Sequence, residues 1–211
     1  MNIITISREF GSGGRELGKR MADILGWDYY DREIIDTVAK EEGLDADYVQ
    51  AVLERHEWWT VPISFSRSFA VYAAPNTELL VKEKEVIERI GLSGRNCIIV
   101  GRNADYFLRD QDPFRIFVCA ELEAKLRRCR ERALDPASLT DKEIKRQIKQ
   151  IDRSRASIRE LTVGDRWGSR SCYHLIVNTT DWEIKTLAPI TADFALHYFQ
   201  RKSAPYDDPS F

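Results

Sequence analysis

Five short apolar runs along the chain are rich in β-branched and aromatic residues, and their pattern predicts β-strands. They cover Ile3–Ser7, Trp27–Tyr30, Asn96–Val100, Arg115–Cys119 and His174–Asn178. The runs do not alternate cleanly between apolar and polar positions, which is typical of strands that are buried on both faces. We therefore expect these strands to lie in the middle of a layered structure.

Between these runs, apolar residues recur at helical spacing. The spacing predicts helices around Leu17–Leu25, Ile34–Val38, Tyr48–Leu53, Leu80–Ile90 and Leu122–Cys129. Further on, Thr140 and Glu143 form a capping box ahead of a charged segment in which isoleucines repeat at helical intervals. Strands that alternate with helices indicate βαβ units. The predicted fold is α/β, a five-stranded parallel sheet flanked by helices.

Two stretches interrupt the alternation within what we expect to be a single domain over residues 1–202. Residues 32–94 are too long for one crossover helix and predict a helical insertion. Its aromatic-rich part, "HEWWTVPISFSRSFAVYAAP", is open to three interpretations: a substrate-facing loop, a contact in a homodimer, or a packed helix–loop segment. The second stretch, about residues 134–160, is dense in arginine. The tail at 203–211 contains two prolines and is expected to be flexible.

The composition excludes several classes of protein. The formal net charge of -2 argues against a general nucleic-acid binder, and no apolar run is long enough to cross a membrane. The N-terminus enters a strand-like run without the pattern of a signal peptide. The four cysteines show no paired spacing, so we expect reduced thiols. These features favour a cytoplasmic protein.

The stretch "SREFGSGGRELGKRM" has the strongest chemical signal in the chain. It lies between the first predicted strand and the first predicted helix. Glycines at such a position allow backbone N–H groups to converge on a phosphate, and the helix dipole favours negative charge there. We expect residues Gly11, Ser12, Gly13, Gly14, Arg15 and Glu16 to bind the phosphates of a nucleotide, with Arg8 on the other side of the loop.

This loop differs from the phosphate-binding pattern G-x-x-x-x-G-K-[ST] at the lysine and near the hydroxyl residue. Gly14 stands where the lysine belongs, and Glu16 stands near the usual hydroxyl. A cation from elsewhere must therefore reach the terminal phosphates. Arg15, Arg8 and Lys19 are the candidates, and Arg15 is equally compatible with a surface position in the first helical turn.

The chain resembles the cytidylate kinase-like family, a branch of the P-loop nucleoside monophosphate kinase superfamily. The resemblance rests on five segments that span most of residues 3–180: "ITISREFGSGGRELGKRMADILGWDYYDREII", "CIIVGRNADYFL", "FRIFVCAELEAKLRRCRER", "IDRSRASIREL" and "RWGSRSCYHLIVNTT". It implies a five-stranded parallel sheet, an insertion that binds the nucleoside monophosphate, and a lid. It also implies ATP and Mg²⁺, with CMP or dCMP as the acceptor. Members of this branch also lack the lysine of the phosphate-binding loop.

The resemblance assigns the acceptor side of the site residue by residue. Asp31 matches an aspartate of the acceptor site, but the residues after it differ from the family pattern. Gly101-Arg102-Asn103 resembles a Gly-Arg-Asp element, so Arg102 is expected to bind the acceptor phosphate. The alternative is that Arg102 pairs with an acidic residue at the end of the strand. Asn103 has lost the charge of that element, and Asp105 is expected to compensate.

Asp152-Arg153-Ser154-Arg155 resembles the Asp-Arg-x-Arg element of the lid. Arg153 and Arg155 are two residues apart and point in different directions on a helix. We therefore assign Arg155 to the transferring phosphoryl group and Arg153 to a supporting role in acceptor binding. The predicted catalytic residues are Arg15, Arg102 and Arg155.

These assignments predict a phosphotransferase that moves a phosphoryl group from ATP to a nucleoside monophosphate. Two alternatives stay open. One is a catalytically weak or inactive module that senses nucleotides. The other is a kinase for a different small acceptor, which the altered residues after Asp31 favour.

Overall fold

The computed structural model describes residues 1–31, 77–133 and 140–203 of the chain. Its strands are β1 (Ile3–Arg8), β2 (Asp28–Tyr30), β3 (Cys97–Val100), β4 (Phe114–Cys119) and β5 (Leu175–Asn178). Its α-helices are α1 (Gly14–Leu25), α5 (Thr77–Leu92), α6 (Ala104–Phe107), α7 (Leu122–Glu131), α8 (Asp141–Val163) and α9 (Ile184–Ser203), and short 3-10 helices cover Arg109–Gln111 and Arg170–Cys172.

The five strands form one parallel sheet, as the sequence predicted, and the structure shows their order to be β2-β3-β1-β4-β5. The central strand β1 pairs Ile4 with Ile98 on one side and Ile6 with Ile116 on the other. Ile4 and Ile6 are almost completely buried, which explains why these runs do not alternate. Because all strands are parallel, their carboxyl ends meet at one edge of the sheet, where α/β proteins bind ligands.

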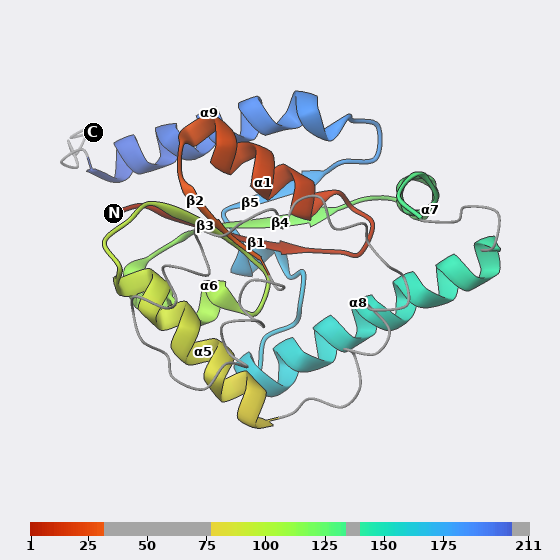
Figure 1. Cartoon of the computed structure of the whole chain (residues 1–211), viewed down its shortest axis with the longest axis horizontal. Coiled ribbons are helices and arrows are strands. Elements are labelled where there is room, and N and C mark those ends of the chain that lie inside the picture. The colour runs from red at the N-terminus through yellow and green to blue at the C-terminus, as the bar shows by residue number, and fades with distance from the viewer. Residues whose placement is uncertain (32–76, 134–139, 204–211) are drawn as a thin grey trace, which may run out of the picture.

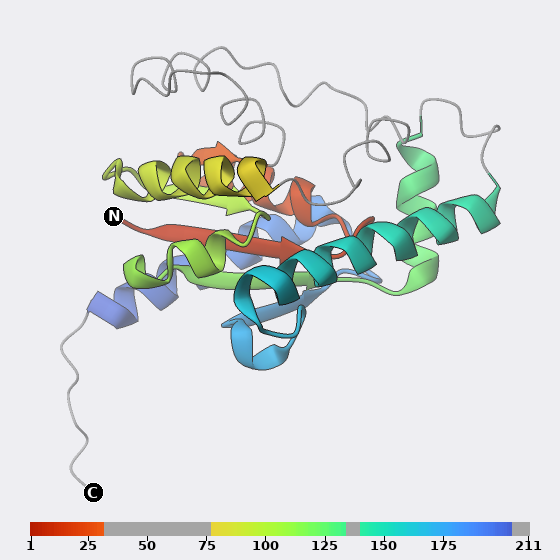
Figure 2. The same cartoon turned by 90° about the horizontal axis from the view of Figure 1, so that it is seen from below.

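Helices cover both faces of the sheet (Figure 1). Helices α1 and α9 lie on one face, and α5, α6 and α8 lie on the other, with α7 at the end towards which β1 points. Figure 2 shows α5, α6 and α8 from below. Leu17 and Met21 of α1 belong to the larger core cluster, and Ile87 and Ile90 of α5 belong to the cluster on the opposite face.

A third, smaller apolar cluster joins α7 to α8. It contains Leu126 and Cys129 of α7 and Ile144 and Ile148 of α8, with Phe10 packed against it. The predicted capping box is present, because the Thr140 hydroxyl accepts the Glu143 N–H and the Glu143 carboxylate accepts the Thr140 N–H. The isoleucines that marked this segment therefore form the buried face of one continuous helix.

Several of the predicted segments lie partly outside the described residues. These are most of the insertion (residues 32–76, including its aromatic stretch), the first part of the lid segment (134–139) and residues 204–211. Within the described ranges, no helix combines the length and the apolar character that a membrane span needs. All four cysteines are free thiols, as predicted.

Candidate functional site

The glycine loop joins β1 to α1 at the carboxyl edge of the sheet. Gly11 and Gly13 adopt the left-handed conformation, with φ of 77° and 83°. A Cβ atom on Gly13 would lie 2.5 Å from Cδ1 of Ile184, so both the backbone and the surrounding space require glycine at this position. The loop thus turns sharply into the N-terminus of α1.

Hydrogen bonds to two other parts of the chain hold this loop. The Glu9 N–H donates to the Val118 carbonyl at 2.9 Å, and the Thr179 hydroxyl donates to the Ser12 carbonyl at 2.6 Å. No residue in the described ranges accepts a hydrogen bond from the N–H groups of Gly13 or Gly14. The first N–H groups of a helix have no intrahelical partner and bind anions well. The loop therefore offers donors for a phosphate.

The structure gives a physical reason for Gly14 in place of a lysine. A Cβ atom on Gly14 would lie 2.7 Å from the Cβ of Arg8 and 3.2 Å from the Cβ of Val118. The Arg8 side chain continues to Gly101, where a Cβ would meet its Nη1 at 1.7 Å. Arg8 thus fills the space beside the loop and reaches the end of β3.

The other proposed cations of the loop pair with carboxylates. Nε of Arg15 lies 2.6 Å from Oδ2 of Asp31, whose side chain is nearly buried. Lys19 pairs with Asp23 on the surface of α1. The structure thus brings Arg15 and Asp31 together, although the sequence assigned them to opposite sides of the site.

Glu16, in the first turn of α1, also belongs to an ion-pair network. Its carboxylate accepts from Nε of Arg20 at 2.8 Å and pairs with Arg132 at the end of α7. Glu16 therefore links α1 to α7 beside the glycine loop.

The loop after β3 carries the predicted acceptor residues. Arg102 and Asn103 have φ of 58° and 52°, a strained conformation for residues other than glycine that often marks functional sites. Nη1 of Arg102 lies 3.2 Å from Oε1 of Glu83 on α5. Arg102 follows the end of β3 and therefore lies at the carboxyl edge of the sheet, where it pairs with an acidic residue.

Asp105 has a different ion-pair partner from Arg102. It forms a buried ion pair with Arg159 of α8, with 2.7 Å between Oδ2 and Nη1, and both side chains are only 4% exposed. Burial raises the pKa of Asp105, and the Arg159 guanidinium opposes that rise. Asp105 thus fastens α8 to α6 in this conformation.

The two arginines of the predicted lid point in different directions, as the sequence predicted. The helix continues unbroken through both residues. Nη1 of Arg155 donates to the Arg8 carbonyl at 2.8 Å, which brings Arg155 to the glycine loop, whereas Arg153 is exposed.

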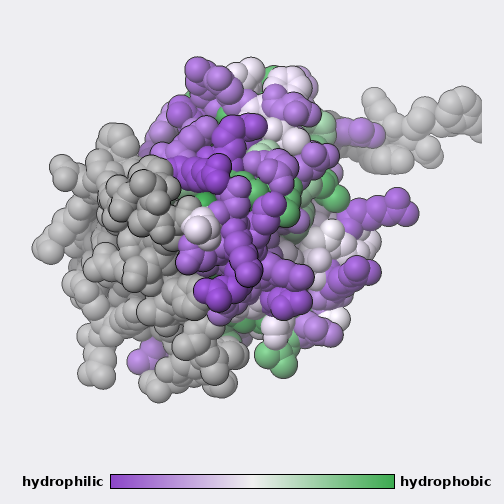
Figure 3. Space-filling view, turned by 90° about the vertical axis from the view of Figure 1, so that its right-hand side faces the viewer, coloured by the Kyte–Doolittle hydropathy of each residue, from purple (hydrophilic) through white to green (hydrophobic). Residues whose placement is uncertain are grey.

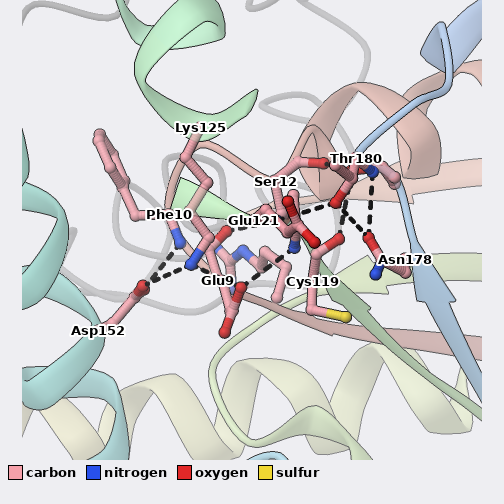
Figure 4. A network of polar contacts seen from close by, with 12 residues as sticks. Glu9, Phe10, Ser12, Cys119, Glu121, Lys125, Asp152, Asn178 and Thr180 are labelled. Atoms are coloured by element: carbon pink, nitrogen blue, oxygen red, sulfur yellow. Dashed lines mark hydrogen bonds and ion pairs between the residues drawn. The ribbon is translucent and has the colours of Figure 1, made fainter. Parts of the chain in front are cut away.

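The sequence reasoning missed a second set of loop contacts (Figure 4). Lys125 of α7 reaches down to the loop, where its Nζ lies 2.6 Å from Oε2 of Glu9 and 3.6 Å from Oδ2 of Asp152. Asp152 of α8 accepts the Phe10 N–H at 2.7 Å. The available signal was the spacing of Lys125, Arg128 and Arg132, which places three cations on one face of a helix.

A cavity of about 550 Å³ lies between α1, α7 and the start of α9. No residue from Gly11 to Arg15 lines it, but Ile184, which does, packs against Gly13. Arg128 lines the cavity and donates to the Thr179 hydroxyl at 3.1 Å and to the Trp182 carbonyl at 3.0 Å. The other lining residues are Glu16, Arg20, Arg127, Glu131, Arg132, Asp181, Trp182, Glu183, Ile184 and Lys185. Figure 3 shows that hydrophilic residues dominate the described part of the face turned towards α7 and α8. In size and in its charged lining, this cavity suits a polar ligand such as a nucleotide.

Comparisons with solved structures agree on the fold. An uncharacterized protein from Eubacterium ventriosum ATCC 27560 is 20% identical, with a TM-score of 0.69 over 92% of this chain and 98% of that one. A gluconokinase from Sinorhizobium meliloti 1021 is 11% identical, with a TM-score of 0.53 over 96% and 98% of the two chains. A shikimate kinase from Bacteroides thetaiotaomicron is 15% identical, with a TM-score of 0.51 over 95% and 97%. The fold is therefore that of the P-loop kinases.

The search of curated proteins found no match. A family description, by contrast, covers most of the sequence and includes the glycine loop, the loop after β3 and the arginines of α8. Residues 3–181 match the cytidylate kinase-like family, and the chain belongs to that family.

Proposed function

We propose that this protein is a nucleotide-binding phosphotransferase that transfers a phosphoryl group from ATP to a nucleoside monophosphate, with CMP or dCMP as the favoured acceptor. The observation that carries this proposal is the pair of N–H donors of Gly13 and Gly14 at the N-terminus of α1, beside a cavity of nucleotide size. Family membership supports the kinase chemistry.

In this proposal the donor phosphates bind to the backbone from Gly11 to Arg15, and the rest of the donor nucleotide occupies the cavity. Arg102 leaves its ion pair with Glu83 and binds the acceptor phosphate instead. Arg155, already at the loop, neutralises charge on the group in transfer. No nucleophilic side chain is needed, because an oxygen of the acceptor attacks directly.

In this proposal Mg²⁺ binds together with ATP. Within the described residues, no cluster of three or more His, Cys, Asp or Glu side chains is arranged to hold a metal ion. Mg²⁺ commonly binds through one or two carboxylates and the phosphates of its nucleotide. Asp31 is the carboxylate that we propose for it, and Mg²⁺ would supply neutralisation of phosphate charge.

A nucleotide-sensing module without catalysis is a second candidate, and the ion pairs favour it. Arg15 and Arg102 contact carboxylates, and the loop has no lysine of its own. The nearly buried carboxylate of Asp31 also suits the hydroxyl of a small alcohol, which would make the protein a kinase for another acceptor.

Turnover assays distinguish these candidates. We expect ADP to form from Mg-ATP in the presence of CMP or dCMP, and more slowly with UMP, AMP and GMP. Arg102→Leu should raise KM for the acceptor about tenfold or more, because it removes a charge-assisted contact to phosphate. Arg109→Leu is the matched control, because Arg109 is an exposed arginine of the same segment.

Other outcomes have distinct meanings. Thermal stabilisation by ATP or ADP without turnover would favour the sensing module. Turnover with a small alcohol but with none of the five nucleotides would reassign the acceptor. If neither binding nor turnover is found with any of these compounds, the proposed function is wrong.

A further inference from the structure

The missing lysine of the glycine loop raises a question that rests on the proposed function: which cation binds the terminal phosphates of the donor? The three candidates from the sequence have other contacts. Arg15 pairs with Asp31, Lys19 pairs with Asp23, and the Arg8 guanidinium lies against Gly101. Among the described residues, the ammonium group that does reach the loop comes from α7.

The side chain of Lys125 runs directly along the loop. A Cβ atom added to Gly11 would lie 3.1 Å from the Cβ of Lys125 and 3.2 Å from its carbonyl oxygen. The Lys125 side chain is only 9% exposed. A buried lysine is costly unless its charge is compensated, and here Glu9 and Asp152 compensate it.

Three donors converge on the carboxylate of Asp152. The Phe10 N–H of the loop donates at 2.7 Å, Nη1 of Arg155 lies 3.4 Å away, and Nζ of Lys125 lies 3.6 Å from the second oxygen. A backbone N–H, an ammonium and a guanidinium are the donors that a phosphoryl oxygen receives in a kinase site. Asp152 thus receives the contacts of an anionic ligand (Figure 4).

We propose that Lys125 supplies the ammonium that the loop lacks and binds the β- and γ-phosphates of the donor, and that Asp152 holds this group in place until nucleotide binds. Phosphate oxygens then replace the Asp152 carboxylate on Lys125. Glu9 keeps Lys125 at the loop during this exchange, because its Oε2 lies 2.6 Å from Nζ and is itself fixed by the Ala120 N–H at 3.2 Å. In this arrangement Lys125 is a binding residue and Glu9 is a positioning residue.

Calorimetric titration of the full-length protein with ADP, AMP and inorganic pyrophosphate tests the proposal. Lys125→Met should weaken binding of ADP and pyrophosphate by about tenfold or more, because a charge-assisted contact is lost. Its effect on AMP, which has no β-phosphate, should be about twofold or less under the same reasoning. Lys145→Met is the matched control, since Lys145 pairs with Glu123 on the surface.

A second variant tests the same idea in the opposite direction. Asp152→Asn keeps an oxygen for the Phe10 N–H but removes the charge that competes with phosphate. It should tighten ADP and pyrophosphate binding by several-fold. If the ion pair between Lys125 and Asp152 is purely structural, both variants should lower the midpoint of thermal unfolding. Neither should then change the ratio of ADP affinity to AMP affinity.

The failures of the two proposals can be told apart. If the wild type binds ADP and Lys125→Met binds it equally well, Lys125 has no such role and the proposed function stands. If the wild type binds none of the three compounds, both proposals are wrong. If Lys125→Met does not fold, the Asp152→Asn titration decides, and unchanged or weaker binding of ADP overturns the inference.

Discussion

At the residue scale, close packing of neighbouring side chains explains the glycines of the loop as well as phosphate binding does. Gly13 is pressed against Ile184, Gly14 against Arg8 and Gly11 against Lys125 and Cys129. Burial raises the pKa of the Cys129 thiol to about 11, so this neighbour of the loop stays uncharged near neutral pH. Each of these glycines therefore allows another element to approach the loop closely.

Replacement of Gly13 by alanine should destabilise the protein more than replacement of Gly26. Both have positive φ, which costs an alanine about 1 kcal/mol. Only at Gly13 does the new Cβ also clash, 2.5 Å from Cδ1 of Ile184, so its total cost should be about 2 kcal/mol or more. Urea unfolding of Gly13→Ala and Gly26→Ala measures the difference, and equal costs would contradict this account of the loop.

The sequence led to predicted roles for the site residues but did not indicate which side chains they contact. The loop and Arg102 were predicted at the carboxyl edge, because a glycine cluster and a strand end are local signals. Arg155 was assigned to the phosphoryl group only through the resemblance of its segment to a lid element. The pairing of Arg15 with Asp31, sixteen residues away, depends on how α1 packs against β2. The approach of Lys125 to the loop depends likewise on tertiary packing, which one sequence does not reveal.

At the scale of elements, strands were the easiest part to predict. All five lie within one residue of their predicted bounds, because each is a short apolar run between polar segments. The expected burial on both faces holds for β3 and most of β1 and β4, but in β5 half-buried and exposed residues alternate. Helix α8 was predicted from its capping box and isoleucine spacing. What local patterns did not indicate is that its Asp152 and Arg155 would contact the glycine loop.

Removal of the cap of α8 gives a test at this scale. Thr140→Ala removes the acceptor for the Glu143 N–H and should reduce the free energy of unfolding by about 1 kcal/mol. Ser157→Ala, at an exposed position of the same helix, should be neutral or slightly stabilising, since alanine is the better helix former. Thermal denaturation followed by circular dichroism compares the two, and an unchanged Thr140→Ala variant would show that packing alone fixes the start of α8.

At the scale of the whole molecule, α8 ties the parts of the site together. One end of it packs on α7, its middle contacts the glycine loop, and Arg159 joins it to Asp105 on α6. The sequence assigned Asp105 to the substrate as a replacement for the charge that Asn103 lacks. The structure shows it in a buried ion pair, whose partner comes from 54 residues further along the chain.

Removal of one partner of this ion pair should destabilise the protein much more than removal of both partners. Arg159→Met leaves the Asp105 carboxylate buried without its guanidinium and should cost about 3–5 kcal/mol of unfolding free energy. The double variant Arg159→Met with Asp105→Leu removes both charges and should recover most of that loss. Denaturant titration of the three proteins measures both steps, and a double variant as unstable as the single one would rule out charge burial as the cause.

The carboxylates that pair with the basic groups around the loop have a consequence for how an anion would enter. Lys125 faces Glu9 and Asp152, Arg15 faces Asp31, and Arg132 faces Glu16. An anion that binds there would have to displace some of these carboxylates, as proposed for Asp152. An anion with several charged oxygens competes with a carboxylate better than chloride or acetate does, so we expect this exchange to favour polyphosphates.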